Sequence, residues 1–389
     1  MSANAADLLQ RVLEIADRVL DAKRIAQAKQ RQADMFAWRR TDYTPILFGR
    51  NVPEFAGMPD FDWTQQFEDP AASLYMQMRG QVTACCSGAD HVPAVRADTG
   101  VVNGPSILGA PYQVPPHTKP VVCGHVSREV LDAFEVPDDI TPLGTMPIMI
   151  RHTRHHVRAL KAAGLWGRVG IHHCDLQGPF DIIAQARGHD DIFLDLYTDA
   201  DLVRRLMAKG VKLFIQMATL CKRLVGDPMT SGHANEYWSG HGSVRLCDDS
   251  GILVGPELYA EHLADAIGQA LAPFGGGWIH YCGGVPDGNR PEGLHLHDIY
   301  FSQPGLLGLQ FTTARDWPGE VARTIRRKKV YPAGLPRPKD ETLEQHFRRV
   351  LALTDNGRGM IYNAPVREGE HDGAVELWHK VQDEMFPSK

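Results

Sequence analysis

The sequence predicts an α/β protein, a (β/α)8 TIM barrel with an N-terminal helical extension. Eight short, mostly apolar segments alternate with amphipathic segments over most of the chain, a pattern typical of strands separated by helices. The 389 residues are 43% hydrophobic and 23% charged, which excludes disordered, collagen-like and coiled-coil proteins. We therefore expect one large globular barrel domain rather than several small domains.

The N-terminal segment predicts a helix outside the barrel. Apolar residues recur there at helical spacing, from Leu8 to Leu20, and the polar stretch to about Gln32 continues the helix. No low-complexity linker or internal repeat interrupts the rest of the chain. We take residues 1–40 as a helical extension and residues 41–389 as the barrel.

The predicted strands are short and near-continuously apolar, as strands buried on both faces should be. They are Thr44–Phe48, His91–Val95, Pro120–Cys123, Arg168–Leu176, Ser243–Asp248, Gly277–Cys282, Leu307–Thr312 and Met360–Ala364. Helices are expected between most of them, for example from Thr198 and from Pro256. The glycine- and proline-rich segment Gly283–Ser302 predicts a long loop after the sixth strand.

Charge and cysteine content limit the function classes. The 41 basic and 47 acidic residues give a net charge of −6, which argues against a nucleic-acid or anionic-membrane partner. The seven cysteines are scattered and odd in number, so they predict a reducing, cytoplasmic location rather than a disulfide framework. No apolar stretch has the ~20 residues of a membrane span, and no signal peptide is recognisable.

The sharpest candidate site is a His-x-Cys pair at the end of the sixth strand. His280 and Cys282 are two positions apart, so on a strand their side chains share one face. Imidazole and thiolate together suit Zn²⁺, but catalytic zinc normally has three protein ligands. From the pair alone, a hydrogen-bonded buried histidine beside an inert cysteine is an equally good interpretation.

The preceding strand ends in two aspartates. Alternation places Arg245, Cys247 and Asp249 on one face of this strand and Asp248 on the other. These aspartates could act as a general base, bind substrate or bind a metal. Neighbouring barrel strands would bring Cys247 or an aspartate close to His280.

Three other strand ends carry polar candidates. Asp175 ends the fourth strand, and Gln177 follows it in a tight turn that suits a ligand-binding loop. Arg50 follows the first strand and Arg96 the second, where an arginine could hold a carboxylate. The chain lacks phosphate-binding glycine loops and a nucleophile elbow, which argues against nucleotide enzymes and serine hydrolases.

The chain resembles the uroporphyrinogen decarboxylase superfamily. The similarity rests on HHCDLQGPFDIIAQARG, DLYTDADLVRRLM, SVRLCDDSGILVGPELYAEHL and GGWIHYCGG, with YTPILFGR and DHVPAVRADTGVVNGPSILGA upstream. The resemblance implies a (β/α)8 barrel whose active site lies at the C-terminal mouth. It also implies one of two chemistries: cofactor-free decarboxylation, or zinc-dependent methyl transfer to or from cobalamin.

The chain departs from both patterns. Only Arg50 stands where the decarboxylases have several arginines, and no cysteine follows Cys282, although the methyltransferase zinc motif has one near the C-terminus. Our leading interpretation is a zinc-dependent methyltransferase that moves a methyl group between a small substrate and a corrinoid protein. His280 and Cys282 would bind zinc, and Cys247 or Asp249 would complete the site.

The remaining candidates then take catalytic or substrate-binding roles. Asp249, Asp175 and Arg50 are the expected catalytic residues, whereas Gln177, Asp248, Arg96 and Tyr281 are expected to contact substrate. The alternative is a cofactor-free decarboxylase or lyase acting on a smaller carboxylic acid, with an aspartate and Arg50 in the main roles. A third possibility is a barrel that binds a ligand without catalysis. The resemblance also implies a homodimer.

Overall fold

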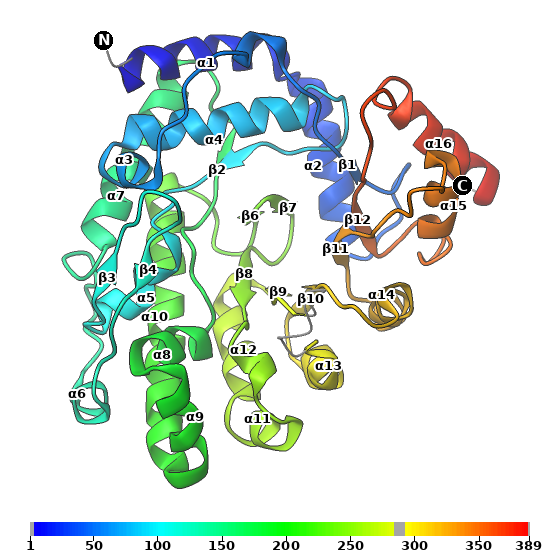
Figure 1. Ribbon diagram of the computed structural model, residues 1–389. Coiled ribbons are helices and arrows are strands. Elements are labelled where there is room, and N and C mark those ends of the chain that lie inside the picture. Colours follow the sequence, from blue (N-terminus) through cyan, green and yellow to red (C-terminus); the bar gives the residue numbers. More distant parts are fainter. Residues whose placement is uncertain (1–3, 284–291, 388–389) are drawn as a thin grey trace.

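Short parallel strands occupy the centre of the structure, a computed structural model that describes residues 4–283 and 292–387 (Figure 1). The parallel strands are β1 (Ile46–Leu47), β2 (Ala94–Val95), β5 (Gly170–Ile171), β8 (Val244–Cys247), β9 (Gly277–His280), β10 (Leu306–Gln310), β11 (Tyr331–Gly334) and β12 (Met360–Asn363). They pair in three groups: β2 with β5, β8 with β9 and β10, and β11 with β12 and β1. The first and last strands of the chain are therefore neighbours.

The arrangement resembles a TIM barrel, but the described residues do not form a closed hydrogen-bonded barrel. A parallel bridge between Gly308 and Val330 links β10 to the segment before β11. The amide of Asp90 donates to the Ile46 carbonyl over 2.8 Å, which links β1 to the segment before β2. Between β5 and β8 the backbone ladder is interrupted. The prediction of short strands that alternate with helices was thus correct, whereas the described residues lack a continuous hydrogen-bonded ladder around a barrel.

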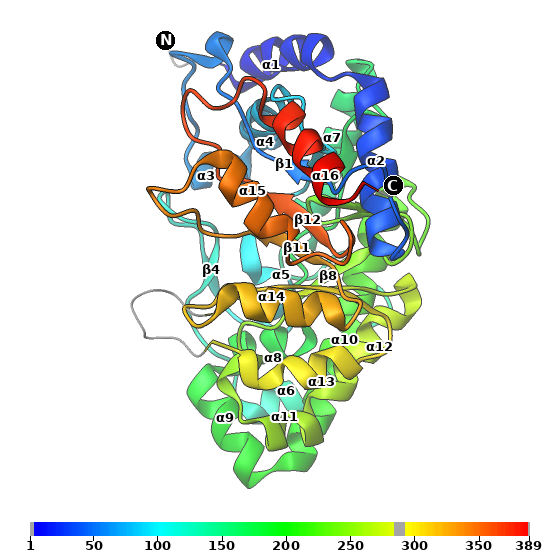
Figure 2. The ribbon, with the colours of Figure 1, turned by 90° about the vertical axis from the view of Figure 1, so that its right-hand side faces the viewer.

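Helices surround the strands. They are α1 (Ala5–Val19), α2 (Ala22–Phe36), α3 (Trp63–Glu68), α4 (Pro70–Cys85), α5 (Asn103–Ile107), α6 (Arg128–Ala133), α7 (Met146–Ala162), α8 (Pro179–Arg187), α9 (His189–Thr198), α10 (Ala200–Val225), α11 (Pro256–His262), α12 (Ala264–Leu271), α13 (His297–Ser302), α14 (Trp317–Arg326), α15 (Leu343–Leu351) and α16 (Ala374–Met385). Helices α14, α15 and α16 cover β11 and β12 (Figure 2). None of the described helices combines the length and apolar character of a bilayer-spanning segment.

The N-terminal segment contains two helices rather than one. Asp21 interrupts the predicted helix because its carboxylate accepts hydrogen bonds from the amides of Lys23 and Arg24 and so starts α2. Helix α1 packs on α4, and α2 packs on strand β7 (Tyr237–Ser239).

One strand prediction was wrong, and one parallel strand was missed. The segment predicted over Pro120–Cys123 forms β4 (Val121–Val122), which pairs antiparallel with β3 (Tyr112–Gln113) outside the parallel sheets. Strand β11 was missed because its sequence, YPAG, contains two residues that are depleted in strands. A second hairpin joins β6 (Gly232–Ala234) to β7. Of the loop predicted over Gly283–Ser302, residues 284–291 lie outside the described residues, and α13 occupies its C-terminal part.

The register of β8, β9 and β10 positions the candidate site. Cys247 lies opposite His280, and His280 lies opposite Gln310. Because these strands are parallel, their carboxyl ends and the residues that follow meet at one edge. Successive side chains on each of these strands then point alternately to the interior and to the surrounding helices.

Candidate metal centre

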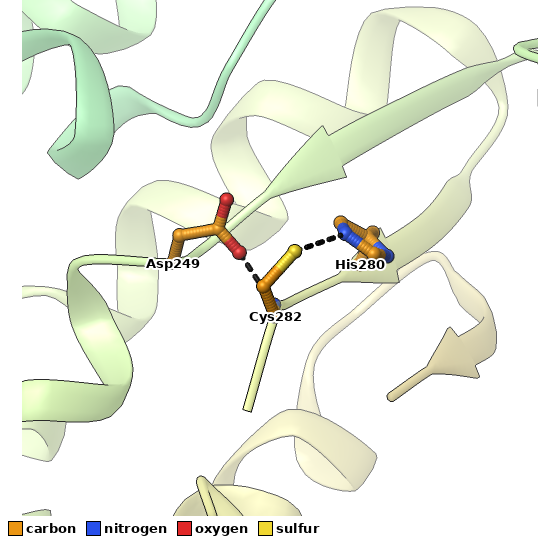
Figure 3. A group of neighbouring side chains, drawn as sticks. All are labelled: Asp249, His280 and Cys282. Atoms are coloured by element: carbon orange, nitrogen blue, oxygen red, sulfur yellow. Dashed lines mark hydrogen bonds between the residues drawn. The ribbon is translucent and has the colours of Figure 1, made fainter. Parts of the chain in front are cut away.

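Three potential metal ligands meet at the carboxyl ends of β8 and β9. One ligand atom from each of Asp249, His280 and Cys282 lies within 4.8 Å of the others (Figure 3). Carboxylate oxygen, imidazole nitrogen and thiolate sulfur are all zinc ligands, and three protein ligands are typical of a catalytic site with an open position. The exposed Cys282 keeps this cluster within reach of solvent.

Backbone pairing brings the three side chains together. The Asp248 amide donates to the His280 carbonyl over 2.9 Å, which extends the β8–β9 pairing beyond Cys247. Asp249 then lies beside Cys282. The backbone amide of Cys282 donates a hydrogen bond to Oδ1 of Asp249 over 2.6 Å. Because His280 and Cys282 are two positions apart, their side chains point the same way, with Nε2 and Sγ 3.1 Å apart (Figure 3).

A glutamine on the neighbouring strand fixes the state of the histidine. The Gln310 side-chain amide donates to the Pro332 carbonyl over 2.7 Å, so its nitrogen faces that carbonyl and its Oε1 faces His280. Oε1 lies 2.9 Å from Nδ1 of His280 and can only accept a hydrogen bond there. Nδ1 therefore carries the proton, and the Nε2 lone pair faces Cys282. This is the state that a metal-binding imidazole requires.

The electrostatic environment also favours a neutral imidazole. Burial lowers the pKa of His280 to about 4, and the Arg245 guanidinium contributes in the same direction. The imidazole is neutral at physiological pH, so no proton competes with a metal for Nε2. The donor set, the tautomer and the protonation state all fit a zinc ion.

Asp181 supports the loop that carries Asp249. This fully buried residue on α8 accepts hydrogen bonds from the amides of Asp249, over 3.1 Å, and Ser250, over 2.7 Å. The two contacts hold the backbone at the point where the chain leaves β8. The position of the Asp249 carboxylate therefore depends on α8 as well as on its own strand.

Cys247, one of the two residues expected to complete the zinc site, lies outside the cluster. Its side chain is buried on the interior face of β8, and its sulfur lies 3.9 Å from Nε2 of Gln177. Among the described residues, Asp249 completes the group with His280 and Cys282. Of the two residues expected as the third ligand, the structure thus places Asp249, and not Cys247, with His280 and Cys282.

Two residues expected to contact substrate lie on the opposite face of the strands. Asp248 is buried and accepts hydrogen bonds from the hydroxyls of Tyr259 and Tyr300. Burial raises the pKa of Asp248 to about 6 despite these two hydrogen bonds. The Tyr281 ring is also buried, and its hydroxyl lies 2.6 Å from Nε2 of His297. Alternation directs both side chains toward the surrounding helices, away from the cluster.

Arg50 does not join the other candidates. Its guanidinium forms an ion pair with Asp372 over 2.8 Å, and both side chains are largely exposed. An exposed pair of this kind contributes little to stability. The expectation that Arg50 holds a substrate carboxylate finds no support in this arrangement.

The remaining candidates form a charged network in the interior. Asp175 accepts a hydrogen bond from Gln177 over 2.7 Å and pairs with Arg96 over 3.4 Å and with Arg245 over 3.8 Å. Burial alone would raise the pKa of Asp175, but the two guanidinium groups hold it well below its usual range. Gln177 has a left-handed backbone, with φ of 57°, which indicates a tightly constrained turn. Asp175, Gln177 and Arg96 therefore lie in contact with one another in the interior, and their roles toward a substrate stay predictions.

Comparison with known proteins agrees with this fold. In sequence, the chain matches no family model and no curated protein. In structure, it is similar to a methyltransferase from Methanosarcina mazei, with a TM-score of 0.65 and 14% sequence identity. The match covers 92% of this chain and 99% of the other. The two proteins therefore share a fold, in agreement with the fold that the resemblance of the sequence motifs implies.

Proposed function

We propose that this protein is a zinc-dependent methyltransferase that moves a methyl group between a small substrate and a corrinoid protein. The observation that carries the proposal is the Asp249–His280–Cys282 cluster at the carboxyl ends of two parallel strands. The structural similarity to a methyltransferase over nearly the whole chain supports the same activity.

The residues around the cluster have distinct tasks in this proposal. Asp249, His280 and Cys282 would hold the ion, while Gln310 keeps the proton on Nδ1 of His280 and Asp181 holds the Asp249 loop. When bound, zinc would supply Lewis-acid chemistry, either lowering the pKa of a thiol or polarising the oxygen of a methyl ether. The interior network around Asp175 and Gln177 would position the substrate.

The alternative decarboxylase function has less support. It relies on Arg50 to orient the substrate carboxylate, and this side chain pairs with Asp372 at an exposed position. It also relies on an aspartate of the Asp248–Asp249 pair. Asp248 is bound by two tyrosines away from the cluster, whereas Asp249 lies with two further metal ligands.

Metal analysis of the purified protein tests the proposal. We expect the parent to bind about one zinc ion per chain and His280→Ala or Cys282→Ala to lose it. Cys247→Ala is the matched control, because it removes a neighbouring thiol outside the cluster and should leave zinc binding unchanged. A parent that binds no zinc after dialysis against the metal would refute the proposal.

Methyl transfer is then tested with free methylcobalamin as the donor, followed by its visible absorption. We expect zinc-loaded parent protein to demethylate it in the presence of an accepting thiol and Cys282→Ala to show no such reaction. Demethylation at the same rate in Cys282→Ala would show that the cluster is not involved.

A further inference from the structure

A guanidinium near the metal cluster has donor capacity that the protein does not use. Arg245 lies on β8, two positions before Cys247 and on the same face as Asp249. Its side chain is only 12% exposed. Its Nε atom is buried and has no hydrogen-bond partner within the described structure. Leaving such a charged donor unpaired is costly, so this position calls for an acceptor.

The nearest carboxylate does not satisfy Arg245. Asp175 Oδ1 lies 3.8 Å from Nη1 of Arg245, too far for a hydrogen bond. Both oxygens of Asp175 are engaged elsewhere, Oδ1 by Gln177 and Oδ2 by Arg96. Asp175 therefore completes its own contacts without using the donors of Arg245.

The interior network around Arg245 holds charges of both signs. Asp98 and Asp175 face three cationic side chains, Arg96, Lys119 and Arg245. Glu236 also acts on Arg245, but its side chain is exposed. Within this network, Arg245 is the cation whose buried Nε atom has no hydrogen-bond partner in the described structure.

The geometry of the Arg245 guanidinium indicates which kind of anion would fit beside it. Its Cζ atom lies 5.8 Å from the centre of the Trp278 ring, so the ring lies within cation–π distance of the guanidinium. Hydrogen bonds from a guanidinium run in its plane, along its N–H edge. A planar two-oxygen anion matches such an edge better than a point charge does.

We propose that Arg245 binds the carboxylate of a small acidic substrate whose other end lies at the Asp249–His280–Cys282 cluster. The inference rests on the proposed function and narrows its substrate class to short carboxylic acids. Arg245 precedes Cys247, the register partner of His280, by two residues, or about 7 Å along the strand. An acid of a few carbons spans this separation, with its carboxylate deeper in the interior than the metal.

The test compares a short acid with its neutral analogue of equal length. The probes are 3-methoxypropionate and 3-methoxypropanamide, and calorimetric titration gives the affinity of each for parent, Arg245→Gln and Arg50→Gln protein. We expect the parent to bind the acid at least tenfold more tightly than the amide. Arg245→Gln should abolish this preference, whereas Arg50→Gln, which removes an exposed ion-paired guanidinium, should retain it.

A second variant keeps the test decisive. If Arg245→Gln does not fold, Arg245→Lys takes its place. This variant retains the charge but loses the paired donors of the guanidinium, so it should keep only part of the preference for the acid. Equal binding of both probes, or of neither, by the parent would overturn the inference, as would an unchanged preference in a folded Arg245 variant.

The titrations are run on zinc-loaded and metal-stripped protein, with zinc content measured in each preparation. Absence of zinc binding together with an Arg245-dependent acid preference would refute the proposed function and leave the carboxylate site intact. Zinc binding without that preference would refute only the carboxylate site.

Discussion

Nδ1 of His280 and Oε1 of Gln310 lie 2.9 Å apart, and this contact decides which imidazole nitrogen faces the metal cluster. The orientation of Gln310 is itself fixed by the Pro332 carbonyl, which can only accept a hydrogen bond. Gln310 on β10 thus sets the tautomer of His280 on β9, although Gln310 is not itself part of the metal cluster.

Gln310→Ala should weaken zinc binding while leaving the fold intact. Without the acceptor, Nδ1 and Nε2 of His280 compete for the proton and the ring can rotate. Loss of such a supporting contact typically lowers metal affinity about 10- to 100-fold. Competition with a chromophoric chelator measures the effect. Gln303→Ala, which also removes an amide bonded to a backbone carbonyl, is the control; equal affinities in the two variants would contradict the role of Gln310.

Asp181→Asn should disturb both stability and metal binding. The two carboxylate oxygens of Asp181 accept two backbone amides, and an asparagine would turn its own donor toward one of them. We expect a loss of about 1–3 kcal/mol in the free energy of unfolding, together with weaker zinc binding. Urea denaturation and chelator competition measure these changes. Asp201→Asn, at an exposed site on α10, should change neither.

Gly178→Ala should be strongly destabilising. A Cβ atom there would overlap the carbonyl oxygen of Cys247, so the turn after β5 could not approach β8 as closely. Because backbone must move, we expect a loss of more than about 2 kcal/mol by urea denaturation. Gly80→Ala in α4 is the contrasting control, because its Cβ would meet open space. It should raise stability by about 0.5–1 kcal/mol. Equal effects would contradict the packing argument.

Stability should fall as the pH is lowered from about 6.5 toward 4. His152 and His156 on α7 are fully buried. Burial lowers the pKa of His152 to about 4 and that of His156 well below its usual value. The unfolded chain therefore binds more protons in this window, by up to about 1.4 kcal/mol per pH unit for each histidine.

Urea denaturation at pH 7, 6 and 5 measures this dependence. His152→Leu should make the dependence shallower because one of the protonation differences between the folded and unfolded chain is removed. His117→Ala, at an exposed position, should leave the slope unchanged. A slope in His152→Leu as steep as in the parent would show that this histidine is not responsible.

Side-chain alternation was the most informative part of the sequence. It correctly placed His280 with Cys282 and Asp249 on the side of Arg245, because the period of a strand does not depend on the rest of the fold. The same rule places Asp248 and Tyr281 on the other face, so assigning them to substrate was inconsistent with it. Their burial beside tyrosine and histidine side chains follows from that alternation.

Contacts between distant segments could not be read from the sequence. The partner of Arg50 is 322 positions away, and the pairing of His280 with Gln310 depends on the register between two strands. Strand β11 forms although it contains Pro332 and Gly334, because β12 pairs with it along its whole length. In each case tertiary structure, rather than local preference, decides the outcome.

The pairing of β1 with β12 has a consequence for synthesis of the protein. Ile46 and Leu47 lie beside Tyr362 and Asn363, so β1 needs a neighbour that the ribosome makes much later than β1 itself. During translation the emerging chain must carry an unsatisfied strand edge, open to wrong partners. We expect nascent chains that stop before Met360 to aggregate or recruit chaperones, and native pairing of β1 to appear only after β12 has emerged.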